Sequence, residues 1–194
     1  MSATNRGGER VALDAYYTPD DVAARCVAAL PLDAVDLCAR WALEPSVGGG
    51  AFVRALRTRS PGAHIVGVDI DPAAAGLALC RAGVVGDFAT IAADYVEREP
   101  SPWLVLGNPP YRDAEAHIRH ALGLVLPGGY VAFLLRLAML ESAKRRPLWA
   151  EHPPISVHVL SARPSFTGGD TDSAPYGWFV WRRGYTGAPT LGWL

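Results

Sequence analysis

The tetrapeptide Asn108-Pro109-Pro110-Tyr111 follows the most apolar short run of the chain, Trp103 to Gly107. Two consecutive prolines hold the backbone in an extended path, so that the Asn108 amide and a proline carbonyl can converge on one point. Such a point suits an exocyclic NH2 group, whose two N–H bonds would donate to the Asn108 oxygen and to the carbonyl of Pro109 or Pro110. The ring of Tyr111 can lie against the flat face of a base. The pattern therefore favours chemistry on an amine that is conjugated to a ring or a carbonyl.

A glycine-rich run, Glu44-Pro45-Ser46-Val47-Gly48-Gly49-Gly50-Ala51-Phe52, separates an expected strand from an expected helix. A turn of this kind at the carboxyl end of a strand lets a ligand approach the backbone closely. The dinucleotide fingerprint requires a third glycine where this chain has Val53, and an anionic pyrophosphate would be repelled by Glu44. An amine or sulfonium cation would be attracted by the same carboxylate. The run predicts a site for a cationic cofactor, with a plain glycine-rich turn as the alternative.

Acidic residues also follow the next expected strands. Asp69 ends an apolar run about 20 residues beyond the glycines, where α/β nucleotide sites bind ribose hydroxyls. Asp71 is suited to cap the helix expected to begin at Pro72. A third carboxylate, for the amine of an adenine, is either Asp87 or Asp94, and the sequence leaves both open.

Apolar periodicity alternates between short strand-like runs and longer helical ones. It predicts strands over 37–43, 64–69, 103–107, 130–135, 155–160 and 178–182, and helices over 20–30, 51–59, 72–82, 115–126 and 137–149. This alternation is typical of an α/β fold with a doubly wound, mostly parallel sheet. The last two strands have no helical pattern between them and are expected to pair antiparallel at one edge. No linker or repeat divides the chain, so we expect a single domain over 1–194 with a flexible tail at 1–15.

Composition limits the class of protein and of partner. The chain has 194 residues, of which 50% are hydrophobic and 19% charged, and this excludes a disordered protein. The formal net charge of −1 excludes a global basic field. Residues 1–111 carry 9 basic and 13 acidic side chains, whereas 112–194 carry 9 and 6. A polyanion would therefore be expected on the second half.

Several features argue against membranes, secretion and metals. No apolar run approaches the roughly 20 residues of a membrane span, and the N-terminus lacks an apolar signal region. Cys26, Cys38 and Cys80 stand apart in apolar surroundings, which is typical of buried thiols in a reducing compartment. The five histidines show no metal-ligand spacing. We expect a cytoplasmic protein without a metal site.

The order of these motifs, preceded by Tyr17-Thr18-Pro19, resembles that of amino-group S-adenosylmethionine-dependent methyltransferases, especially the DNA adenine-N6 enzymes. The resemblance covers nearly the whole chain, and the C-terminal part is similar to small phage or prophage enzymes. It implies a Rossmann-like sheet of seven strands with an antiparallel C-terminal hairpin, S-adenosylmethionine as cofactor, and methyl transfer to an exocyclic amine. Adenine N6 is preferred over cytosine N4, with Asn108, Pro109, Pro110 and Tyr111 as the catalytic residues. The implied cofactor residues are Tyr17, Thr18 and Pro19 at the methionyl part, Glu44, Ser46, Gly48 and Gly50 around it, Asp69 at the ribose, and Asp87 or Asp94 at the adenine.

The resemblance also implies where a target would bind. In the family, the C-terminal hairpin carries an aromatic residue that stacks on a base flipped out of the helix. Phe166 is the candidate here, with Arg163 as a further substrate contact, and the alternative is that Phe166 packs beneath its loop. Sequence-specific members carry a separate recognition domain, so we expect limited specificity, or specificity from loops, a homodimer or a partner. The expected substrate is single- or double-stranded DNA; an RNA base, a protein glutamine, and a non-catalytic cofactor-binding subunit are the alternatives.

Overall fold

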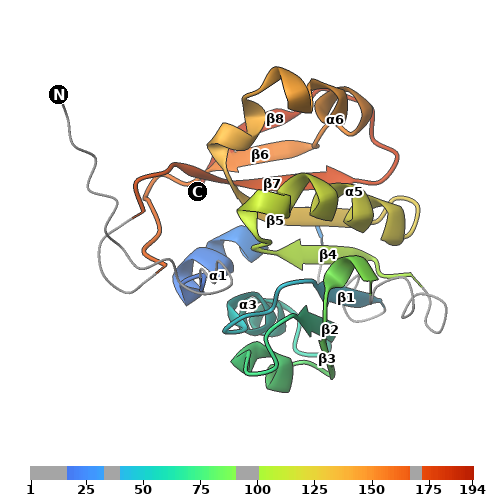
Figure 1. Ribbon diagram of the computed structural model, residues 1–194, viewed down its shortest axis with the longest axis vertical. Helices are drawn as coiled ribbons and strands as arrows, with labels where there is room; N and C mark the ends of the chain where they lie inside the picture. The colour runs from blue at the N-terminus through green and yellow to red at the C-terminus, as the bar shows by residue number, and fades with distance from the viewer. Residues whose placement is uncertain (1–16, 33–39, 91–100, 167–171) are drawn as a thin grey trace.

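The apolar runs form one mixed sheet in the order β3-β2-β1-β4-β5-β7-β6-β8 (Figure 1). The computed structural model describes residues 17–32, 40–90, 101–166 and 172–194, and these contain all eight strands. Their bounds are β1 Trp41–Glu44, β2 His64–Asp69, β3 Ala82–Val85, β4 Leu104–Gly107, β5 Tyr130–Arg136, β6 Ser156–Val159, β7 Tyr176–Arg182 and β8 Thr190–Trp193. The predicted α/β class and the mostly parallel sheet are confirmed.

Among the eight strands of the sheet, only β7 runs opposite to the others. Strands β3, β2, β1, β4 and β5 are parallel, and β7 pairs antiparallel with both β5 and β6. The sequence order reverses between β1 and β4, which are direct neighbours. At such a reversal the chain leaves the two strands in opposite directions, which opens a crevice beyond their carboxyl ends. Glu44 and Gly107 end these two strands, so the crevice is placed between the two main motifs.

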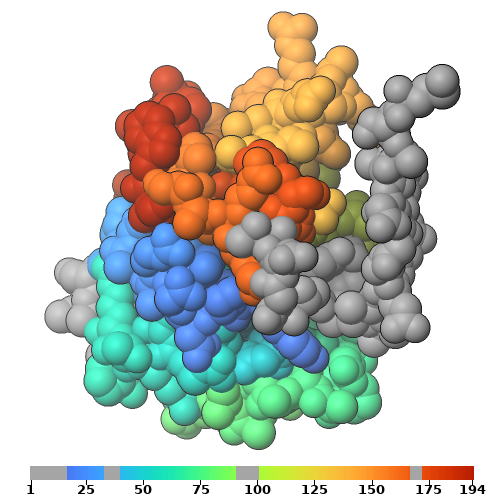
Figure 2. Space-filling view, turned by 90° about the vertical axis from the view of Figure 1, so that its left-hand side faces the viewer, coloured from blue at the N-terminus to red at the C-terminus, as the bar shows by residue number. Residues whose placement is uncertain are grey.

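Helices cover both faces of the sheet. The bounds of the α-helices are α1 Asp20–Ala28, α3 Ala51–Arg59, α5 Ala114–Leu124 and α6 Arg146–Glu151. Successive strand residues point to opposite faces; Leu104 and Leu106 therefore share a core with α1 and α3, while Val105 packs with α5 and α6. Figure 2 shows the outer side of α1 (blue) between α3 (cyan) and the C-terminal part of the chain (orange and red).

The α3 side is closed by a contact between distant aromatic residues. Phe52 from α3 stacks on Trp178 from β7, with 5.3 Å between ring centroids and 11° between planes. Both rings are at most 1% exposed. This contact fixes the start of α3, and with it the glycine turn, against the middle of the sheet.

The number of strands was predicted wrongly. The structure has eight strands rather than seven, because β8 pairs in parallel with β6 and extends the sheet beyond the hairpin. The antiparallel pairing of β6 and β7 is confirmed, but β7 lies inside the sheet and β8 forms the edge. The flexible tail expected at 1–15 lies outside the described residues.

Two predicted helices were also wrong. The segment 72–82 forms only a 3-10 helix over Ala75–Leu79, where Gly76 packs directly on Gly50, and the chain enters β3 at Ala82. The segment 137–149 is divided into 3-10 helices over Leu137–Leu140 and Ala143–Arg145, followed by α6. Ser142 stands between these turns with a φ of 115°, which interrupts helical geometry. Across the described ranges, no helix is long and apolar enough to cross a membrane.

Candidate cofactor and amine site

Glu44 is a buried carboxylate at the carboxyl end of β1, and 2% of its surface is exposed. Burial raises its pKa well above the ordinary value, and the nearby charge of Asp69 raises it further. The Arg54 guanidinium and the backbone N–H of Val53 act in the opposite direction. Its Oε2 atom has no hydrogen-bond partner among the described residues. A buried charge of this kind is costly unless an opposite charge offsets it, so the position is suited to a cationic ligand.

The glycine turn beside Glu44 requires glycine at specific positions. Gly48 and Gly50 have φ angles of 45° and 79°, in the left-handed region that other residues rarely adopt. A Cβ atom on Gly50 would lie 2.7 Å from Leu79 Cδ1 and 2.9 Å from the Cα of Gly76. A Cβ on Gly49 would lie 3.8 Å from its nearest neighbour, which is ordinary contact. The chain therefore needs glycine at 50 much more than at 49.

This difference gives a matched pair of variants. We expect Gly50→Ala to lower the free energy of unfolding by about 2 kcal/mol or more, because it adds backbone strain to a steric clash. Gly49→Ala should cost less than about 0.5 kcal/mol, as a typical tolerated substitution does. Urea unfolding monitored by tryptophan fluorescence measures both values. Equal costs would contradict the arrangement of the turn described here.

Asp69 braces the end of β2 against the glycine turn. Its carboxylate accepts the N–H of Gly48 at 2.7 Å through one oxygen and the N–H of Asp71 at 2.9 Å through the other. Each oxygen keeps a second lone pair that can accept a hydroxyl donor. Asp71 in turn accepts the N–H of Ala73 at 2.9 Å, as a capping residue would, although the structure that follows is a 3-10 helix. The role of Asp69 at a ribose stays a prediction.

An open cleft of about 270 Å3 lies beyond β1 and β4. Several predicted site residues line it, although they come from three separate parts of the sequence. The lining contains Tyr17, Thr18, Glu44, Ser46, Gly48, Gly50 and Asn108, together with Val47, Gly49, Ala51 and Phe52. The structure thus brings the predicted cation site and the predicted amine site into one cleft.

Asn108 lies directly after β4 at the edge of this cleft. Its Nδ2 donates a hydrogen bond to Oγ1 of Thr18 at 3.2 Å, across 90 residues of sequence. Pro109 is buried, and Pro110 precedes a 3-10 helix over Tyr111–Asp113. The rigid dipeptide thus carries the chain from the sheet into α5 while the Asn108 side chain faces the cleft.

Tyr111 belongs to an aromatic and cationic cluster that the sequence analysis did not identify. Its ring lies 5.5 Å from that of Tyr176, and the Arg136 guanidinium carbon lies 4.9 Å above its centroid. Arg136 donates to the Tyr176 hydroxyl at 3.1 Å, and that hydroxyl donates to Asp172 at 2.9 Å. Burial raises the pKa of Tyr111 well above its ordinary value. The phenol therefore stays neutral and firmly held beside Asn108.

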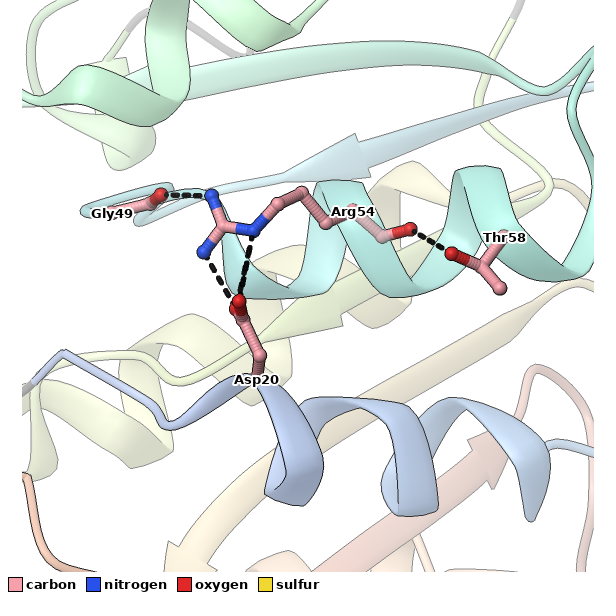
Figure 3. Close-up of polar contacts among 4 residues, drawn as sticks. All are labelled: Asp20, Gly49, Arg54 and Thr58. Atoms are coloured by element: carbon pink, nitrogen blue, oxygen red, sulfur yellow. Dashed lines mark hydrogen bonds and ion pairs between the residues drawn. The ribbon is translucent and has the colours of Figure 1, made fainter.

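A second interaction missing from the sequence analysis fixes the wall of the cleft. Arg54 on α3 donates to both carboxylate oxygens of Asp20 at 2.6 to 3.2 Å, and to the carbonyl of Gly49 at 2.7 Å (Figure 3). Asp20 opens α1 directly after the Tyr17-Thr18-Pro19 segment. Arg54 thereby ties that segment to the glycine turn. The only sequence signal was an arginine in the first turn after the glycines, with no indication of its partner 34 residues away.

Loosening this connection should affect cofactor binding more than stability. We expect Arg54→Gln to raise the Kd for S-adenosylhomocysteine about 5-fold, because the segment carrying Tyr17 and Thr18 loses its anchor. The melting temperature should change little, since exposed ion pairs contribute at most about 1 kcal/mol. Arg57→Gln, an exposed change on the same helix, is the control and should alter neither quantity. Calorimetric titration compares the two variants, and equal affinities would contradict the anchoring role.

Other predicted residues that the structure describes do not line the cleft, among them Pro19, Asp69, Pro109, Pro110 and Tyr111. Phe166 is 8% exposed and meets Tyr176 edge-on at 5.1 Å, and this burial favours the alternative to stacking on a base. The stacking role of Phe166 on a target base stays a prediction. Arg163 is exposed, and Asp87 is exposed and accepts the N–H of Ala89 at 3.1 Å. Asp94 lies outside the described residues, and the choice between it and Asp87 stays open.

No family model matches the sequence. Over 72 residues the chain is 43% identical to the type II methyltransferase M.TthHB8I of Thermus thermophilus, a stretch of 36% of this chain and 15% of that relative. A Listeria monocytogenes protein described as a class I S-adenosylmethionine-dependent methyltransferase superposes with a TM-score of 0.66 and 15% identity, over 92% of this chain and 65% of that one.

Two further solved structures share this arrangement. A Vibrio vulnificus protein described as the modification subunit of a type I restriction enzyme gives a TM-score of 0.67 at 15% identity, over 93% of this chain and 47% of that one. A Bacillus cereus O-methyltransferase in complex with S-adenosylhomocysteine gives a TM-score of 0.57 at 14% identity, over 87% of this chain and 83% of that one. The chain has the class I methyltransferase fold. Because it covers less than two thirds of several of these relatives, its activity has to be argued from its own site.

Within the methyltransferase fold, the cleft lies at the reversal between β1 and β4, where open α/β sheets bind ligands. Among the described residues, no group of three or more His, Cys, Asp or Glu side chains is arranged to hold a metal ion. The donor set consists instead of one buried carboxylate, left-handed glycines and an amide. These are groups that suit an organic cation and an amine.

Proposed function

We propose that the protein transfers a methyl group from S-adenosylmethionine to an exocyclic amine of a nucleic-acid base, with adenine N6 in DNA as the preferred target. One observation carries the proposal. The buried Glu44 carboxylate, which suits a cation, and the Asn108 amide, which suits an NH2 group, line the same cleft. A dinucleotide-dependent dehydrogenase would need neither group there.

The residues present fit S-adenosylmethionine as the cofactor. Glu44, with its unpartnered Oε2, would offset the positive charge of the ligand. Gly48 and Gly50 leave the turn without side chains, and Asp69 keeps lone pairs for ribose hydroxyls. When bound, the cofactor supplies an electrophilic methyl group on a sulfonium sulfur. We assign Tyr17, Thr18 and Ser46, which line the cleft, to its methionyl side, together with the adjoining Pro19.

The amine would be held by Asn108 and the proline backbone. The Asn108 oxygen accepts one N–H of the target, and the carbonyl of Pro109 or Pro110 accepts the other. Two acceptors in fixed positions orient the nitrogen and draw electron density onto it, and such positioning is a large part of catalysis. The proton is lost after the N–CH3 bond forms, so the site needs no general base. Tyr111 would stack on the base through the ring face away from Arg136.

DNA is the substrate class favoured by the relatives and by charge. The Thermus thermophilus relative is a type II methyltransferase, and the Vibrio vulnificus structure is described as a modification subunit of a restriction enzyme. The second half of this chain carries the basic excess, with Arg112 and Arg163 exposed. We propose that a second copy or a partner subunit contributes to the choice of target. The cytoplasm suits this activity, and Cys26 and Cys80 are free thiols.

The test is methylation of defined DNA at low salt. The protein is incubated with labelled S-adenosylmethionine and single- or double-stranded DNA, and the digested nucleosides are separated by mass spectrometry. We expect N6-methyladenosine, in its deoxy form, as the labelled product. Label in N4-methylcytosine would change the base, and label confined to RNA or to protein glutamine would change the substrate class. A protein that binds the cofactor but labels none of these would be a binding subunit, and the proposal would be wrong.

A further inference from the structure

Thr18 is in contact with the residue that we assign to the target amine. Its Oγ1 accepts the hydrogen bond from Asn108 Nδ2 at 3.2 Å, and both side chains line the cleft. The resemblance assigns Thr18 to the cofactor, and nothing in that assignment involves Asn108. Through this contact, Thr18 is linked to the residue that we assign to the target amine as well as to the cofactor.

A side-chain amide has two chemically different ends. The oxygen accepts hydrogen bonds and the NH2 group only donates them. If the NH2 end faced a target amine, two donors would meet and the target would be repelled. The site therefore functions only if something fixes which end of Asn108 faces the target. In the structure the Thr18 hydroxyl accepts from the NH2 group, so the amide oxygen lies at the other end of the side chain.

We propose that Thr18 is a positioning residue, which holds the Nδ2 end of Asn108 so that the oxygen end is presented to the target amine. The inference rests on the proposed function and deepens it by adding a residue that acts through another. Thr18 need not touch the target for this role.

The segment that carries Thr18 is itself held in place. The Tyr17 ring covers the glycine turn so closely that a Cβ on Gly48 would lie 3.0 Å from its Cδ1. Asp20, two residues after Thr18, is bound by Arg54 through both carboxylate oxygens. A hydroxyl between two such anchors has a defined position, which an acceptor needs if it is to orient another side chain.

The primary test compares Thr18→Val with Thr18→Ser. Valine keeps the shape but removes the acceptor, and serine keeps the hydroxyl. We expect Thr18→Val to lower kcat on DNA about 10- to 100-fold, the range for a misplaced catalytic group. Because Thr18 is also assigned to the cofactor, kcat is measured at saturating S-adenosylmethionine, and Thr18→Ser should recover most of it. Thermal melting of each variant checks that the fold is kept.

Testing Thr18→Val in a protein that already carries Asn108→Asp shows whether Thr18 acts through the Asn108 amide. Aspartate at position 108 has two equivalent oxygens, so its orientation no longer matters. In the Asn108→Asp background, we expect Thr18→Val to change the single-turnover rate less than about 2-fold. A residue that acts only on the cofactor or on the fold would cost the same in both backgrounds, as independent effects add.

The outcomes separate this inference from the proposed function. If the wild-type protein methylates DNA but Thr18→Val matches it in kcat, or loses cofactor affinity instead of kcat, the positioning role is overturned. An equal loss in the Asn108→Asp background also overturns it. If the wild-type protein methylates no amine at all, the proposed function fails first, and the S-adenosylhomocysteine titrations then show whether the cleft binds the cofactor.

Discussion

Replacement of Asn108 with alanine is expected to reduce methyl transfer at least about 100-fold, the usual cost of removing one preorganised polar group from a reacting centre. The amide oxygen is the side-chain acceptor for the target amine, and alanine provides no substitute. Binding of S-adenosylhomocysteine should remain within about 3-fold, since Glu44 and the glycine turn are unchanged. Transfer of labelled methyl groups to DNA measures the first quantity, and calorimetry measures the second.

The control for this variant is Ser101→Ala, which lies just before the same strand, β4, at its opposite end. It should match the wild-type protein in both assays. An Asn108→Ala protein that keeps more than a tenth of the activity would show that the amine is held elsewhere. Loss of cofactor binding together with activity would show that Asn108 belongs to the cofactor wall.

Glu44→Gln is expected to weaken cofactor binding and to stabilise the protein without its ligand. A charge-assisted contact contributes about 1.5 to 3 kcal/mol, so the Kd for S-adenosylmethionine should rise roughly 10- to 100-fold. S-Adenosylhomocysteine lacks the sulfonium charge and should lose less affinity. Without ligand, the glutamine removes a buried charge, and we expect the melting temperature at pH 7.5 to rise by about 3 °C.

The pH dependence of this variant follows from the raised pKa of Glu44. The folded protein binds a proton at this group more tightly than the unfolded chain, so the wild-type protein loses stability as the pH rises from the unfolded towards the folded pKa. The stability difference between Glu44→Gln and wild type should therefore shrink as the pH is lowered towards about 4, near the ordinary carboxyl pKa. Asp71→Asn, at a half-buried carboxylate that is not among the residues lining the cleft, is the control and should show neither effect. If Glu44→Gln raised the Kd for S-adenosylmethionine and for S-adenosylhomocysteine by the same factor, the cation site would be contradicted.

Local patterns predicted the elements around the site well. The helix after the glycine turn was predicted over 51–59 and is α3, Ala51–Arg59, because a turn signal marks its start and a 3.6-residue period marks its length. Strand β2 was predicted with the same bounds, 64–69. Strands β3 and β8 were missed because they have few buried side chains and contain glycine, so their pattern is not that of a core strand.

The contacts that complete the site could not be predicted in the same way. The Thr18–Asn108 bond joins residues 90 positions apart, and the Arg54–Asp20 pair spans 34. Neither partner carries a local signal of the other, since both contacts exist only after the sheet has formed. The burial of Phe166 likewise depends on Tyr176, which belongs to β7. Sequence gave the types of the functional groups, and tertiary packing decides which of them meet.

The position of β7 has a consequence for how the chain reaches this structure. β7 lies between β5 and β6 although it follows both in the sequence, and it pairs with β5 along all seven residues from Tyr176 to Arg182. Until those residues leave the ribosome, β5 has an open edge and β6 has no neighbour to join. Such non-local pairing is formed late and slowly. A chain that ends before β7 would therefore expose an unpaired strand edge and tend to aggregate. We expect such a fragment to be bound by chaperones or degraded by proteases, and not to act as a smaller enzyme.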